Sequence, residues 1–197
     1  NRAIAFDIDN LLSEADDVTV IHDLYITEGG ETAHIDHVII NQCVDVYLVD
    51  SSLALTQLYV DQDGDWSIAG ESAINVPTLS PVSDLRSKAI MLGRIIGHNR
   101  HFLPEHLNEA VVPNISYFVL NSNEATTKTS NKEEFLIEPG DIPSHIKPRG
   151  IVNRVRRHIN KEQLYEFANH LVKLNSPDGD QWYQRFDISK ESAVSNR

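Results

Sequence analysis

Two acidic residues in neighbouring strands are the side chains of this chain best placed to do chemistry. The stretch Glu31–Ser52 has the pattern of two β-strands rich in Val and Ile, joined by a polar turn at Asn41 and Gln42. Asp36 falls inside the first strand and Asp50 ends the second. A carboxylate on an apolar strand face is costly unless something pairs with it. Two such carboxylates on adjacent strands are what a divalent metal ion needs.

The alternation of strand side chains predicts which residues accompany each acid. Asp36 should share a face with Val38, and Asp50 should share a face with Leu48 and Ser52. The alternative for a buried acid is a hydrogen bond to a backbone or histidine neighbour, with no metal involved.

The charge of the chain is unevenly distributed. The formal net charge is −12, and residues 1–75 hold fifteen Asp or Glu against one basic residue, Arg2. Such an acidic field repels nucleic acid unless metal ions or a local basic patch reverse it. One basic cluster occurs within residues 147–161, and it consists of Lys147, Arg149, Arg154, Arg156, Arg157 and Lys161. A solvated helix face is the ordinary role of such a cluster, but it is also the best candidate for contact with a phosphate backbone, with Arg154, Arg156 and Arg157 at its centre.

Length and composition predict an ordinary globular protein. The 197 residues fit one domain, or one domain with a helical extension. No apolar run approaches the ~20 residues of a membrane span, so we expect no membrane partner. The single cysteine, Cys43, excludes an internal disulfide and fits a reducing compartment, so we expect a cytoplasmic location.

The pattern along the chain predicts an α/β fold. We expect helices at 3–15, at 81 onward behind an N-cap at Ser80, at 151–159 and at 161–174. Further strands are expected at 18–26, 53–60, 111–120 and 134–138, with a hairpin tip at 61–65. The 61–65 run lacks the glycine that a calcium loop needs at its sixth position, where Trp66 stands.

The segment GGETAHIDHVIINQCVDVYLVDSS resembles the nuclease-related domain, or NERD, of bacterial proteins. In that family an ID-H-V strand precedes a turn and a second strand that ends in an acid-x-Lys pair. The later Trp66, the SPVSDLR stretch and VPNISYFVLNSNEA also look like that family. The resemblance covers most of residues 7–160. It implies a restriction-endonuclease-like core of the PD-(D/E)xK type: a mixed central sheet with antiparallel hairpins flanked by helices, plus C-terminal helices.

The resemblance also implies a chemistry and assigns residues to it. In PD-(D/E)xK nucleases two strand carboxylates, often with a helix acid, hold Mg²⁺ or Mn²⁺, which activates water against a phosphodiester. Asp36 matches the first acid and Asp50 the second, while Asp7 or Asp9 matches the helix acid.

Ser52 stands where the family has its lysine, and a serine supplies no charge and is a poor base. Arg86 and Lys88 on the following helix are the basic residues that could replace it.

Three hypotheses follow from the sequence. The first is a NERD-like domain with a degenerate site, weak or inactive in catalysis and accessory in nucleic-acid processing. The second is an active Mg²⁺- or Mn²⁺-dependent nuclease with a migrated basic residue, and the third is a protein–protein interaction module. The expected organisation is a nuclease-fold domain at 1–160 and a helical extension with a tail at 161–197. The degenerate site is the preferred hypothesis because Ser52 replaces the lysine.

Overall fold

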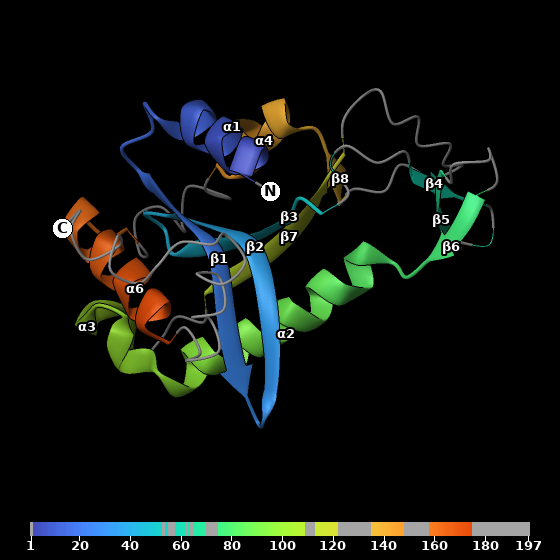
Figure 1. Ribbon diagram of the computed structural model, residues 1–197. Helices are drawn as coiled ribbons and strands as arrows, with labels where there is room; N and C mark the ends of the chain where they lie inside the picture. The colour runs from blue at the N-terminus through green and yellow to red at the C-terminus, as the bar shows by residue number, and fades with distance from the viewer. Residues whose placement is uncertain are drawn as a thin grey trace, which may run out of the picture.

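The structure is a computed structural model, and it describes residues 2–52, 54, 58–61, 63, 65–69, 75–108, 113–121, 135–147 and 158–174. Within these residues a mixed five-stranded sheet lies between two layers of helices, and a small three-stranded sheet lies to one side (Figure 1). The α/β class and the nuclease-like core expected from the sequence are confirmed.

The central sheet has the strand order β1-β2-β3-β7-β8. Its members are β1 (Val18–Glu28), β2 (Glu31–Asn41), β3 (Asp45–Asp50), β7 (Asn114–Leu120) and β8 (Leu136–Ile137). The first three strands form an antiparallel meander, whereas β3 pairs in parallel with β7 and β7 in parallel with β8. The glycines at 29 and 30, both with positive φ, allow the tight turn between β1 and β2.

Helices cover both faces of this sheet (Figure 1). On one face, α1 (Arg2–Leu12) and the short α4 (Ile142–His145) pack with Ile39, Tyr47 and Val49 of the central strands. On the other face, α2 (Pro81–His98) and α6 (Lys161–Lys173) share one core cluster with Val38, Leu48 and their neighbours. The alternating apolar residues of β2 and β3 therefore contribute to two hydrophobic cores, one on each face of the central sheet.

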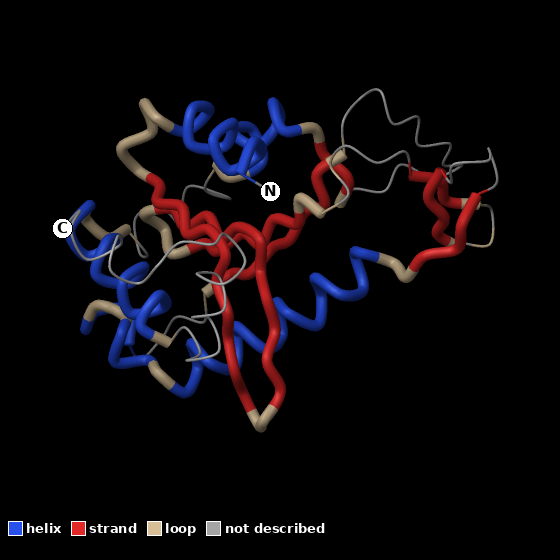
Figure 2. The backbone as a smooth tube through the Cα atoms, viewed as in Figure 1, coloured by secondary structure: helices blue, strands red, loops and turns tan. Residues whose placement is uncertain are grey.

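The second sheet consists of β4 (Leu58–Val60), β5 (Trp66–Ala69) and β6 (Asn75–Thr78), all antiparallel. Figure 2 shows it at the start of α2, apart from the central sheet. Val60 pairs with Trp66, so the run between them is the hairpin tip that the sequence predicts. Short turns of helix connect the remaining elements: η1 (Arg100–Phe102), α3 (Glu105–Asn108) and η2 (Pro139–Asp141).

The helices α2 and α6 agree with the sequence signals at their N-termini. The Ser80 side chain accepts a hydrogen bond from the Ser83 N–H, which caps α2 as expected. Asn160 and Gln163 form a reciprocal capping box at the start of α6. Of the helix expected at 151–159, residues 151–157 lie outside the described residues, and 158–160 are not helical.

One irregularity interrupts β1 and β2. The pairs His22–His37 and Leu24–Ile35 are in register, but Asp23, at the position between them, has a φ of 55°. Ile35 consequently packs into the same core cluster as Val38, although strict alternation would put them on opposite faces. The distortion lies at the level of Asp36, which means that simple alternation does not describe the surroundings of this acid.

None of the helices within the described part of the chain has the length and apolar character needed to cross a membrane.

Candidate acidic site at the ends of β2 and β3

The strand register places Asp36, in the middle of β2, beside Asp50 at the end of β3. The pairs between β2 and β3 run from Ile40–Val46 through Val38–Leu48 to His37–Val49. Asp36 and Asp50 occupy the next position on each strand. The sequence prediction that two neighbouring strands present these acids together therefore agrees with the observed register.

Asp50 is held by the residue that follows it by two positions. The Ser52 backbone N–H and hydroxyl both donate to Asp50 Oδ1, at 2.8 and 2.5 Å. Asp50 itself is 7% exposed. Ser52 stands where the lysine of an acid-x-Lys pair would stand, and its two donors stabilise the carboxylate within the chain. The serine closes a local turn around the acid and brings no cation to it.

Asp36 is held in the same way by Ser51. The Ser51 backbone N–H and hydroxyl both donate to Asp36 Oδ2 at 2.9 Å, and the other oxygen, Oδ1, lies 3.6 Å from His34 Nδ1. Burial by itself raises the pKa of Asp36, but the two Ser51 hydrogen bonds and the nearby His34 and His37 outweigh burial, so the pKa falls below its usual value. Asp36 is therefore ionised at neutral pH.

Two further histidines approach the site from the α1 side. His37 Nε2 lies 3.0 Å from the Ser51 hydroxyl, and His37 Nδ1 lies 2.7 Å from His22 Nδ1. Burial, together with the adjacent His22, lowers the pKa of His37 to about 4. Ser51, His37 and His22 were not among the site residues expected from the sequence. The cross-strand pairing of the two histidines is the signal that could have indicated them, because β1 and β2 place them directly opposite each other.

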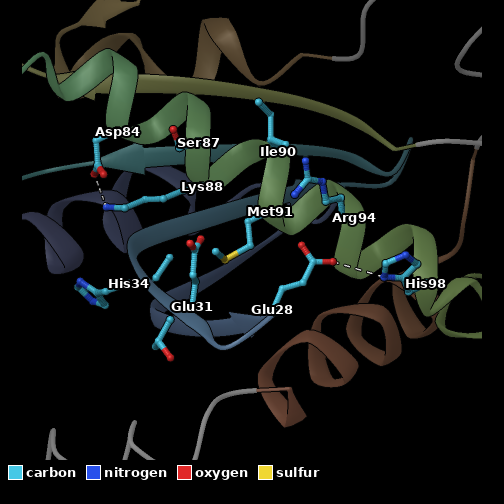
Figure 3. A pocket seen from close by; sticks show the side chains of 13 residues that line it. Glu28, Glu31, His34, Asp84, Ser87, Lys88, Ile90, Met91, Arg94 and His98 are labelled. Carbon is cyan, nitrogen blue, oxygen red and sulfur yellow. Dashed lines mark ion pairs between the residues drawn. The ribbon is translucent and has the colours of Figure 1, made fainter.

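A cleft opens between the β1–β2 hairpin and α2 (Figure 3). Its volume is about 1110 Å³, and the residues labelled in Figure 3 lie along it, from Glu28, Glu31 and His34 on the hairpin to Asp84, Ser87, Lys88, Ile90, Met91, Arg94 and His98 on α2. His34 connects the cleft to the acidic site, since it lines the cleft and also contacts Asp36.

The basic residues proposed as replacements for the missing lysine have different surroundings. Lys88 lines the cleft and forms an ion pair of 2.6 Å with Asp84, one helical turn away. Arg86 is exposed on α2 and is not among the cleft-lining residues. Of the two basic residues expected to replace the lysine, Lys88 is therefore the one that shares the cleft with His34, the neighbour of Asp36.

The two candidate acids of α1 have other surroundings. Asp7 is exposed on α1, and Asp9 Oδ1, on the same helix, lies 3.0 Å from His22 Nε2. Arg154, Arg156 and Arg157 lie outside the described residues.

The side chains that the structure describes offer few ligands for a divalent metal ion. Among these residues there is no group of three or more His, Cys, Asp or Glu that could hold one. One oxygen of Asp36 and one of Asp50 already accept two hydrogen bonds each from serine. Mg²⁺ needs near-octahedral oxygen coordination, for which two carboxylates without a helix acid are a sparse set. The donor set does not fit a preformed Mg²⁺ or Mn²⁺ centre.

A comparison with models of protein families gives a match for this chain. The model of the nuclease-related domain, NERD, matches residues 2–119, which run from α1 into β7 and include both strand acids. The chain belongs to the NERD family. Its NERD region thus contains the acidic site, the cleft and the whole of α2. Searches of curated proteins and of solved structures found no match to this NERD chain.

Proposed function

We propose that this NERD protein has a degenerate nuclease site and an accessory, nucleic-acid-binding role. The observation that carries the proposal is the pair of hydrogen bonds from Ser52 to Asp50. A lysine at this position would place an ammonium beside the attacking water and the phosphate. Serine replaces that cation with a neutral donor that is already directed at the acid. Family membership supports a nuclease-related role, and the absence of the cation argues against efficient cleavage.

Nucleic-acid binding is assigned to the basic cluster, because the first third of the chain is acidic. The cluster of residues 147–161 follows the NERD region, and its charge offsets the acidic field locally. The division into a nuclease-fold domain at 1–160 and a helical extension with a tail at 161–197 belongs to the same proposal, as does a cytoplasmic location. In this account the acidic site is a remnant of catalysis, while the contact with phosphates is made elsewhere.

Weak, salt-sensitive binding to DNA or RNA is the expected result in a fluorescence-anisotropy titration. Arg154→Gln, Arg156→Gln and Arg157→Gln together should weaken it and reduce the slope of log affinity against log salt by about 2–3, since each phosphate contact contributes ~0.9. Lys173→Gln, an exposed change at the end of α6, is the control and should leave the slope near its original value. Binding that is insensitive to salt and to the triple change would refute the assignment.

An active nuclease is the second candidate, and the position of Lys88 is the observation in its favour. Lys88 lines the cleft that His34 shares, and it is 18% exposed. Its ammonium is paired with Asp84, so this ion pair would have to break before Lys88 could contact a phosphate group of the substrate. We therefore rank this candidate below the degenerate site.

A further inference from the structure

A continuous chain of hydrogen bonds joins the surface of α1 to the Asp36 carboxylate. Asp9 Oδ1 lies 3.0 Å from His22 Nε2, and His22 Nδ1 lies 2.7 Å from His37 Nδ1. His37 Nε2 lies 3.0 Å from Ser51 Oγ, which donates to Asp36 Oδ2 at 2.9 Å. The chain therefore crosses from helix α1 through two strands to the strand acid of the site. The exposed fraction falls from 59% at the Asp9 side chain to zero at Ser51.

At the Asp36 end of this series of hydrogen bonds, the ionised carboxylate determines the positions of the Ser51 and His37 protons. An ionised carboxylate can only accept, so the single hydroxyl proton of Ser51 points to Asp36. The Ser51 oxygen must then accept from His37, which places a proton on His37 Nε2. The hydrogen bond between the two Nδ1 atoms needs one further proton on one of the two rings.

The Asp9 end adds one more proton. Asp9 is a carboxylate facing His22 Nε2 at 3.0 Å, so that nitrogen also carries a proton. The two rings together hold three protons, one more than two neutral imidazoles hold. The extra charge belongs on His22, since this ring is 26% exposed beside a carboxylate whereas His37 is 2% exposed. The lowered pKa of His37 agrees with this placement.

We infer that Asp9 and His22 are positioning residues for Asp36, acting through His37 and Ser51. The imidazolium of His22, held by Asp9, keeps His37 in its neutral tautomer with the proton on Nε2. That tautomer directs the Ser51 hydroxyl to Asp36 Oδ2 and leaves Oδ1 on the side of His34 and the cleft. The inference rests on the proposed site only in that Asp36 is the acid being oriented; it requires neither cleavage nor nucleic-acid binding.

The loss of charge at Asp9 should remove the extra proton from His22. In Asp9→Asn the amide can accept from His22 Nε2 through its oxygen or donate to it through its NH2 group, but no charge remains to hold the imidazolium. The two rings then hold two protons in place of three. Where the amide oxygen accepts, His37 donates from Nδ1 and its Nε2 accepts from Ser51, so Asp36 keeps only the Ser51 backbone N–H.

Nitrogen-15 NMR of the histidine rings at pH 7 tests this directly. In the unaltered protein we expect both His22 nitrogens to carry protons, and His37 to be neutral and protonated at Nε2. In Asp9→Asn His22 should become neutral, while Asp7→Asn, an exposed acid of the same helix, should leave both rings unchanged. His22→Gln and His37→Gln assign the signals.

A neutral His22 in the unaltered protein would overturn the inference, as would a His22 that stays doubly protonated in Asp9→Asn. The spectrum of the unaltered protein decides the proton order even where a variant fails to fold. A negative result here leaves the binding titration above untouched, so the failure of this inference and that of the proposed function are distinguishable.

Discussion

Lowering the pH from 6.5 to 4 should reduce the free energy of unfolding by about 3 kcal/mol through His37 alone. Burial holds the pKa of His37 at about 4 in the folded protein, against 6.5 for an unperturbed histidine. Between pH 6.5 and 4, His37 is protonated in the unfolded chain but neutral in the folded chain, so the free energy of unfolding falls as the pH falls. The contribution of His37 to stability is fully present above pH 6.5. One pH unit is worth about 1.4 kcal/mol, which gives the stated magnitude.

Urea denaturation at several pH values measures this effect. His37→Gln should flatten the profile between pH 6.5 and 4, because the titrating group is gone. His101→Gln, at an exposed position, is the matched control and should keep the slope of the unaltered protein. Equal slopes in His37→Gln and the unaltered protein would show that the buried ring does not titrate as described. Asp36, with its lowered pKa, adds a separate loss only as the pH falls below its usual value, near 3.8.

The double variant Asp50→Glu with Ser52→Lys should gain DNA cleavage when Mn²⁺ is supplied in excess, because two carboxylates without a preformed centre hold a metal ion only weakly. The change replaces the neutral donor of Ser52 with an ammonium two residues after the acid and lengthens that acid by one methylene. Positioned acid–base groups contribute typically ~10²–10⁴-fold, so we expect at least about 10²-fold more cleavage than in the unaltered protein. Asp36 and the strand register are retained in this variant, so it needs no change in the fold.

Two controls separate a restored site from an altered surface. Asp50→Glu with Ser52→Ala removes the serine donor without adding a cation, and we expect it to stay inactive. Asp36→Ala in the double variant should abolish the gained cleavage. A double variant that folds, binds DNA and shows no gain would mean that more than the lysine has been lost from the site.

The sequence predicts the framework of this protein because its signals are local. The apolar period of α2 with its Ser80 cap, and the Val- and Ile-rich strands β2 and β3, form as expected. The same local reasoning places Asp36 and Asp50 on adjacent strands, and the register brings Asp36 beside the end of β3.

The partners of the two acids could not be predicted from local patterns. The hydrogen bonds of Ser51 and Ser52 depend on how the chain turns after β3, and turns of this kind have no periodic signature. Strict alternation also fails at Asp36, because the positive φ of Asp23 distorts the strand beside it. The contact between His22 and His37 requires the register of β1 against β2, which a single strand pattern does not specify.

A cleavage assay with Mn²⁺ on single- and double-stranded DNA distinguishes a degenerate nuclease site from an active one. We expect the unaltered protein to leave both substrates intact, because Ser52 occupies the lysine position and a preformed metal site is lacking among the described residues. Asp36→Ala should then be indistinguishable from the unaltered protein. Robust metal-dependent cleavage that is abolished by Asp36→Ala would show that the site is an active nuclease site, and its loss in Lys88→Ala as well would identify Lys88 as the migrated base.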